Sequence, residues 1–253
     1  MYNLNGVRYT IEDGVATIML ARPEVSNSID LATARSFGAV VEAAGADDAV
    51  RVILLTGDGP RFCAGGDVAW VASAADPASA LLELANELDS ALQSLGALPK
   101  PVVASVQGAA AGAGLGVVLA ADVVVSARST RYLTAYANVG LTPDCGVSWL
   151  LPRAVGQQRA LELALTGRVL SADEARDWGL VTTVVEDDEL ATATAQLATK
   201  LAAGAPYALG QARRLIRSSY AVSRANSGAD ESRTVSAAAE TTEAQAAIAQ
   251  FVK

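Results

Sequence analysis

Apolar runs rich in β-branched residues alternate along this chain with stretches in which apolar residues recur at helical spacing. The runs predict strands at 7–12, 15–20, 51–56, 101–106 and 122–126. The stretches at helical spacing predict helices at about 30–44, 77–95, 157–165 and 171–179, with another that ends near 121. The repeated order of strand, turn and helix indicates an α/β fold.

Turn and capping residues set several of these boundaries. Asp13-Gly14 joins the first two strands and predicts a tight hairpin. The segment 171–174 (Ser-Ala-Asp-Glu) has the form of a capping box, so a helix should begin there and end at Gly179.

The remaining segments follow a coarser pattern. The stretch 71–77 looks like a loop. From Asp188 onward the chain is Ala-rich and helical in pattern, with breaks expected near 204–206 and near Ser227-Gly228.

Composition narrows the possible functions. With 253 residues, 51% of them hydrophobic, the chain can bury a large core. A net charge of −8 without a dense Lys/Arg run argues against nucleic acid as a partner. No apolar stretch of about 18 residues and no export signal is evident, so we expect a cytoplasmic protein that binds no membrane.

The absence of histidine and the scarcity of cysteine remove whole reaction classes. With no histidine, a Ser-His-Asp triad, a Cys-His pair and most catalytic zinc sites are excluded. Cys63 and Cys145 lie far apart without metal-ligand spacing, which suits a reducing compartment and packed thiols. Acid–base chemistry therefore falls to Asp, Glu, Lys, Tyr or Cys.

Two Gly/Ala-rich turns, 62–68 and 108–116, carry the strongest chemical signal. Each follows an apolar run and so lies where a strand ends. Small residues leave backbone N–H groups uncovered. Two such turns that meet at one point can hold a negative oxygen between two amide donors, which is the geometry an enolate requires.

Several motifs stand in order along the chain, at 23–27, 62–67, 100–104, 108–122, 150–156 and 175–181. Together they resemble the crotonase family, the enoyl-CoA hydratase/isomerase superfamily. The resemblance runs from about residue 7 to the C-terminus. It implies a crotonase-like spiral of ββα units, with a core domain at 1–195 and a helical C-terminal oligomerisation region at 196–253. It also implies acyl-CoA thioester substrates, no metal, no cofactor beyond the coenzyme A of the substrate, and homotrimers or dimers of trimers.

The resemblance also implies which atoms hold the enolate. The donors are the backbone amides of Gly66 and Ala113, and the second opens a helix whose dipole adds to the same field. Each such donor is typically worth about 10²–10³ in rate. Substrate contacts are implied for Ala64, Asp67, Val68, Tyr136, Arg22 and Val25, with Arg22 and Arg61 as candidate partners of the CoA phosphates.

The positions of the carboxylate side chains then indicate which reaction of the family to expect. Family hydratases carry two glutamates at the positions matched here by Gly116 and Tyr136, so this chain departs from the hydratase pattern. Asp144 matches the single acid of Δ3,Δ2-enoyl-CoA isomerases and of ring-opening isomerases. One carboxylate can remove a proton and return it two carbons away, so we expect an isomerase with Asp144 as the proton shuttle. Tyr136, Val139, Leu141 and Trp149 are the expected walls around that carboxylate.

Other interpretations stay open at this point. Asp144 follows a turn and also suits a helix N-cap. A 4-chlorobenzoyl-CoA dehalogenase-like hydrolase would use an aspartate at this position, but that enzyme type also needs a histidine. An enoyl-CoA hydratase-like enzyme and a non-catalytic acyl-CoA binder complete the alternatives.

Overall fold

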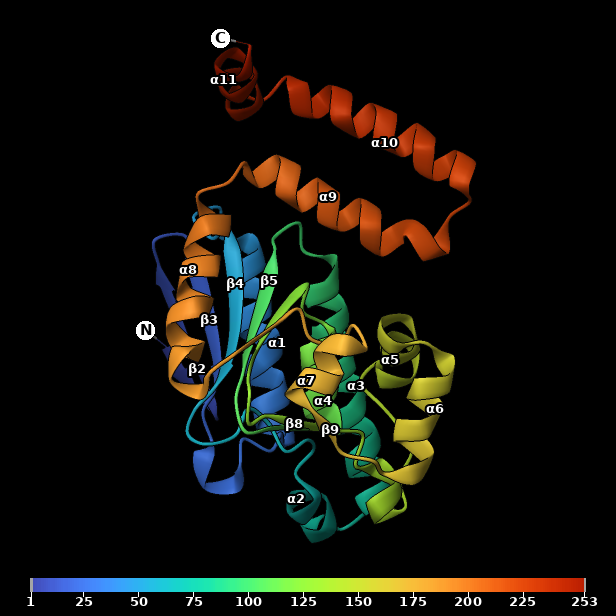
Figure 1. Ribbon diagram of the computed structural model, residues 1–253. Helices are drawn as coiled ribbons and strands as arrows, with labels where there is room; N and C mark the ends of the chain where they lie inside the picture. The colour runs from blue at the N-terminus through green and yellow to red at the C-terminus, as the bar shows by residue number, and fades with distance from the viewer. Residues whose placement is uncertain (1, 253) are drawn as a thin grey trace.

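A computed structural model describes residues 2–252 and builds the body of the protein around one seven-stranded sheet (Figure 1). Its strands are β1 (Tyr2–Leu4), β2 (Val7–Glu12), β3 (Val15–Leu20), β4 (Val52–Gly57), β5 (Val102–Val106), β7 (Val123–Ala127) and β10 (Thr183–Val185), side by side in that order. β1, β2 and β3 pair antiparallel, and the strands from β3 to β10 are parallel. The predicted strands and the α/β class are confirmed.

The predicted hairpin between β2 and β3 is confirmed. Glu12 pairs with Val15, and the two residues between them adopt positive φ angles, 48° at Asp13 and 79° at Gly14. Such angles give a two-residue turn the twist that matches its strands.

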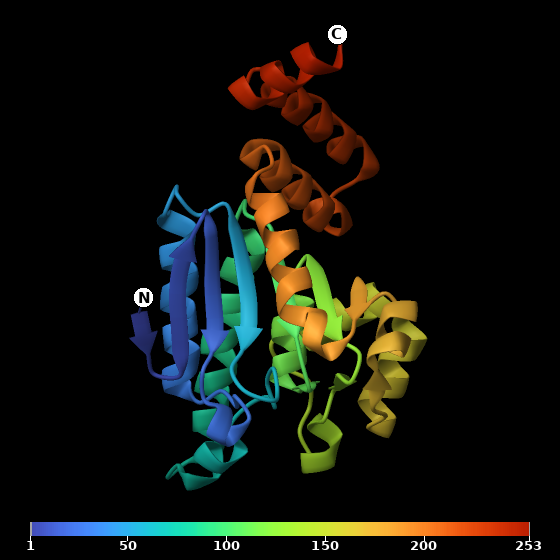
Figure 2. The same cartoon turned by 60° about the vertical axis from the view of Figure 1, so that its left-hand side comes forward.

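Helices cover both faces of the sheet. α1 (Leu31–Ala46) and α3 (Pro77–Ala97) pack against each other on one face, and their Leu, Val and Phe side chains enter the main core. α8 (Leu190–Ala202) crosses the other face, where it contacts β4, β5 and β7. Figure 2 shows α8 lying across the front of these strands.

A second, smaller sheet follows the same alternation of strands and helices. β6 (Ala109–Ala111), β8 (Arg131–Leu133) and β9 (Leu170–Ser171) form a three-stranded sheet. Its strands contact α4 (Ala113–Leu119) and α7 (Ala172–Asp177), and α5 (Val147–Val155) packs against α4 and α6 (Gln157–Thr166). The predicted capping box is confirmed at Ser171 and Glu174, and the helix ends before Gly179, whose φ is 89°.

The predicted loop at 71–77 is largely wrong. α2 (Val68–Ser73) extends into it, so that only 74–76 lie between helices. Asp67 caps α2 by accepting a hydrogen bond from the Trp70 amide at 3.0 Å. That cap stabilises a short helix in a segment without a long apolar repeat.

The C-terminal helices α9 (Pro206–Ser218), α10 (Arg224–Ala239) and α11 (Thr242–Phe251) stand beyond the end of the sheet (Figure 1). The predicted break at 204–206 is confirmed. The break predicted at Ser227-Gly228 is wrong, because α10 runs through it. A glycine costs a helix only about 1 kcal/mol, and Ser223 caps this one by accepting a hydrogen bond from the Asn226 amide.

Two further observations concern the chain as a whole. The domain boundary expected at residue 195 falls inside α8, which packs on the sheet. None of the helices within residues 2–252 combines the length and apolar character needed to cross a membrane.

Candidate active site

The two Gly/Ala-rich turns meet backbone to backbone. Cys63 pairs with Ala110 in an isolated parallel bridge, and the Ala111 amide donates to the Cys63 carbonyl at 3.0 Å. Glycine makes this approach possible, because a Cβ atom on Gly114 would lie 2.6 Å from the Cys63 carbonyl oxygen. Gly65, with a φ of 105°, is also close, since its Cβ would lie 2.9 Å from the Ala111 oxygen. The two turns therefore converge as the sequence predicted.

Two amides at this junction have no internal acceptor. Gly65 accepts from the Ile29 amide and Asp67 donates to the Ile29 carbonyl, which leaves the intervening Gly66 N–H unbonded. Ala113 is the first residue of α4, where an N–H has no intrahelical partner. Within residues 2–252, neither N–H donates a hydrogen bond to another protein group. Both residues line a single cavity.

This cavity, called here the reaction cavity, has a volume of about 180 Å³ and mostly apolar walls. Its lining comprises Ala64, Gly65, Gly66, Val68, Val71, Leu81, Leu84, Gly112, Ala113, Ala135, Tyr136, Val139, Leu141 and Asp144. Tyr136, Val139 and Leu141 therefore lie where the sequence placed them. Trp149 does not line this cavity: its ring lies under the Arg153 guanidinium at 3.6 Å, and it lines a second cavity, described below, that Asp144 also lines.

Asp144 is the one carboxylate among the residues that line the reaction cavity, and Tyr136 holds it. The Tyr136 hydroxyl donates to Asp144 Oδ1 at 2.7 Å. Burial, together with the Asp144 charge, raises the pKa of Tyr136, so the phenol stays protonated and remains a donor. The N-cap interpretation of Asp144 is wrong: the N-cap of α5 is Gly146, and no side chain caps that helix.

Strained backbone flanks this pair on both sides. Ala135, just before Tyr136, has a φ of 62°, and Cys145, just after Asp144, has a φ of 50°. A left-handed conformation costs a residue with a Cβ of order 1–3 kcal/mol and persists where the surrounding structure enforces it. The fold therefore imposes the placement of the tyrosine and the aspartate.

Comparison with known proteins identifies the family to which the chain belongs. A family model described as enoyl-CoA hydratase/isomerase matches residues 10–253. The chain belongs to the enoyl-CoA hydratase/isomerase family. It is 40% identical over 213 residues to the 1,2-epoxyphenylacetyl-CoA isomerase of Escherichia coli, covering 82% of this chain and 80% of that one. It is 38% identical to the trans-2-decenoyl-[acyl-carrier-protein] isomerase of Streptococcus mutans, covering 78% and 76% respectively.

Solved structures agree with the sequence comparison. The enoyl-CoA hydratase of Polaromonas sp. JS666 superimposes with a TM-score of 0.90 at 30% identity, covering 97% of this chain and 96% of that one. The protein thus has the crotonase-type α/β fold of its family. Because named relatives include isomerases and hydratases, the family alone leaves the reaction undecided.

The structure explains why a hydratase carboxylate is missing from α4. A Cβ atom on Gly116 would lie 2.9 Å from the Cys145 carbonyl oxygen and 3.1 Å from the Cys145 Cβ. The loop that carries Asp144 therefore fills the space beside Gly116. Any larger residue at this position must displace that loop.

The cysteines behave as packed thiols, as predicted. Cys63 is fully buried, and burial raises the pKa of its thiol to about 12. Burial and the adjacent Asp144 carboxylate raise the pKa of Cys145. Both groups are neutral near pH 7 and supply no thiolate nucleophile.

Three of the predicted substrate contacts lie outside the reaction cavity. Arg22 forms ion pairs with Asp30 and Asp67, each at 3.1 Å, so two carboxylates balance its charge. Asp67 is buried and also caps α2, while Val25 is 38% exposed. Contacts of Arg22, Val25 and Asp67 with a substrate stay predictions. Ala64 and Val68 line the cavity.

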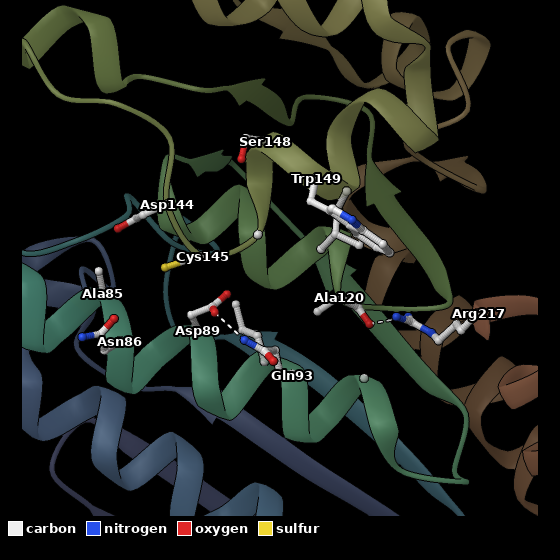
Figure 3. A pocket seen from close by; sticks show the side chains of 14 residues that line it. Ala85, Asn86, Asp89, Gln93, Ala120, Asp144, Cys145, Ser148, Trp149 and Arg217 are labelled. Atoms are coloured by element: carbon white, nitrogen blue, oxygen red, sulfur yellow. Dashed lines mark hydrogen bonds between the residues drawn. The ribbon is translucent and has the colours of Figure 1, made fainter. Parts of the chain in front are cut away.

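Sequence reasoning missed a second, larger cavity that adjoins the first. It has a volume of about 650 Å³, lies between α3, α5 and α9, and shares Asp144 with the reaction cavity (Figure 3). We call it the rear cavity. Asn86, Asp89 and Gln93 line it from one face of α3. Their spacing of three and four residues within a leucine-rich helix was the available signal.

Proposed function

We propose that this protein is an acyl-CoA isomerase that shifts a double bond from the Δ3 to the Δ2 position. One observation carries the proposal. The reaction cavity combines two backbone amides without internal acceptors and, among its described lining residues, a single carboxylate. Isomerisation needs these groups and no second acid.

The geometry supports a short sequence of steps. Asp144 removes a proton from C2 of a 3-enoyl thioester, and the electron pair moves onto the thioester oxygen. The amides of Gly66 and Ala113 hold that oxygen while it carries the charge. Asp144 then returns the proton to C4, the double bond forms between C2 and C3, and the carboxylate is regenerated. Tyr136 fixes one carboxylate oxygen and leaves the other to exchange the proton.

Two residues favour isomerisation over hydration. Tyr136 and Gly116 occupy the positions where the resemblance places the hydratase glutamates, and Gly116 has no room for a side chain. A hydratase needs one group to activate water and another to protonate carbon.

A product assay tests the proposal. Purified protein incubated with 3-octenoyl-CoA is expected to form 2-octenoyl-CoA, and 2-octenoyl-CoA is expected to gain no water at a significant rate. Chromatography of the products separates the two reactions. A hydration kcat/KM of about 10⁷–10⁸ M⁻¹s⁻¹, near the range of highly efficient enzymes, would overturn the proposal.

Replacing Tyr136 by phenylalanine is expected to lower the isomerisation kcat by roughly tenfold to a hundredfold. The substitution removes one hydrogen bond to a charged group, an interaction worth about 1.5–3 kcal/mol. KM should change little, because the phenol holds Asp144 and not the thioester.

Tyr132→Phe is the matched control for this variant. The Tyr132 hydroxyl also donates to a buried partner, Ser126, at 2.7 Å, but it does not line the reaction cavity. Its kcat should equal that of the wild type. Full activity in Tyr136→Phe would show that the hydrogen bond to Asp144 is not needed.

We also propose that three or six copies assemble through the helical region 196–253, beside a core at 1–195. α10 and α11 bury almost nothing against the body, and Val235, Ile248, Phe251 and Val252 are each more than half exposed. The molar mass from light scattering tests this assembly.

The substrate thioester supplies the coenzyme A, and we propose no other cofactor. The two free cysteines fit the proposed cytoplasmic location.

A further inference from the structure

The rear cavity lies where the distal part of an acyl group must go. This inference rests on the proposed function, in which Asp144 exchanges protons with C2 and C4. Asp144 is the residue common to both cavities, so carbons beyond C4 lie past Asp144, on the side of the rear cavity. The reaction cavity, at about 180 Å³, is also too small for a long acyl chain.

The rear cavity does not resemble a site for plain hydrocarbon. Figure 3 shows Asn86, Asp89 and Gln93 along α3, with Arg217 of α9 at the far end. Arg217 is held there by the Ala120 carbonyl at 2.6 Å and by Asp122 at 2.7 Å. Polar side chains from two helices thus face the path of the acyl tail.

Asp89 is a charged group on this path that keeps a free hydrogen-bonding atom. Its Oδ2 accepts from Gln93 Nε2 at 2.6 Å. Its Oδ1 accepts no hydrogen bond from the described residues and points toward the loop that carries Asp144. A Cβ on Gly146 would lie 3.9 Å from that oxygen. Asp89 Oδ1 is therefore a free acceptor beside the loop that carries Asp144, the residue that both cavities share.

An alkyl chain that lies beside Asp89 Oδ1 makes the binding free energy less favourable. It would strip water from Asp89 Oδ1 and offer no hydrogen bond in return, and leaving a buried charged acceptor unpaired is unfavourable. A hydroxyl on the chain replaces the lost water and donates to the carboxylate. A site of this kind discriminates strongly between a ligand with the hydroxyl and one without it.

We propose that Asp89 is a specificity residue that selects acyl groups bearing a hydroxyl beyond C4. Asp89 takes no part in proton transfer and acts on the bound acyl tail. The substrate class is therefore a hydroxylated acyl-CoA instead of a simple fatty acyl-CoA.

Binding of saturated probes tests this proposal without any need for turnover. Octanoyl-CoA is compared by calorimetry with 5-, 6-, 7- and 8-hydroxyoctanoyl-CoA. In the wild type, at least one hydroxylated probe should bind about tenfold or more tightly than octanoyl-CoA, the value of one hydrogen bond to a charged group. In Asp89→Leu this advantage should vanish, and octanoyl-CoA should bind more tightly than it does to the wild type.

The control for the leucine variant is Glu87→Leu, on the same helix. Glu87 pairs with Arg35 at 3.8 Å, away from the rear cavity, so this variant should keep the hydroxyl preference. Asp89→Asn retains the shape and a weaker acceptor, and it should show an intermediate preference. It also gives a second measurement if the leucine variant fails to fold.

Two results would overturn the proposal. Equal binding of octanoyl-CoA and every hydroxylated probe to the wild type would show no hydroxyl site. A preference that persists undiminished in Asp89→Leu would assign that site to another residue. Isomerisation of 3-octenoyl-CoA is measured separately. A hydroxyl preference without isomerisation would therefore refute the proposed reaction and leave the Asp89 site standing.

Discussion

Replacing Asp144 by asparagine is expected to lower the isomerisation kcat by about 10²–10⁴. Asparagine has the size of aspartate and still offers an oxygen to the Tyr136 hydroxyl, but it cannot take up the substrate proton. Acyl-CoA binding should stay nearly unchanged, because the amides of Gly66 and Ala113 and the apolar walls are intact. The comparison requires kcat, the dissociation constant of octanoyl-CoA and a thermal melting curve for both proteins.

Hydrogen exchange at C2 gives an independent measure of the same step. Wild-type protein in deuterated water should exchange the C2 protons of a bound saturated acyl-CoA, because enolate formation is reversible. Asp144→Asn should lose that exchange. If both exchange and isomerisation survive in a folded variant, Asp144 is not the base. Tyr136 and Cys145 would then be the next groups to replace.

Local signals predicted much of the fold. The Asp13-Gly14 hairpin and the capping box at 171–174 involve residues close in sequence, and the structure has both. The apolar, β-branched run at 101–106 predicted a strand because such a run is typical of a strand that is buried on both faces. The helix break predicted near Gly228 was wrong, because the signal used for it was too weak. A glycine's local cost is small, and the Ser223 cap and the following residues of α10 outweigh it.

The site was predictable only in part. The two turns could be found because glycine and alanine at a strand end have a direct backbone meaning. The Tyr136–Asp144 hydrogen bond could not, since it depends on left-handed backbone at Ala135 and Cys145, residue types that rarely adopt it. Trp149 stacks with Arg153 four residues later in α5, a local contact that helical spacing could have indicated.

The second large effect is expected at the backbone of Ala113. Ala113→Pro deletes the N–H that the proposal assigns to the enolate oxygen, and kcat should fall by about 10²–10³. Proline is tolerated at the first residue of a helix, where no intrahelical hydrogen bond is lost and its φ is suitable. The preceding residue, Gly112, has no Cβ to clash with the proline ring. The variant should therefore fold.

Ala113→Val separates the lost donor from the added bulk. Valine is close to proline in size and keeps the backbone N–H, so any loss of activity in this control measures crowding of the reaction cavity alone. The difference in kcat between the two variants then reports the replacement of the N–H by the proline Cδ, provided that octanoyl-CoA binds both with similar affinity. Equal activity in Ala113→Pro and Ala113→Val would show that the Ala113 amide does not stabilise the enolate. A loss confined to the proline variant would identify a backbone N–H at the start of α4 as part of the catalytic machinery.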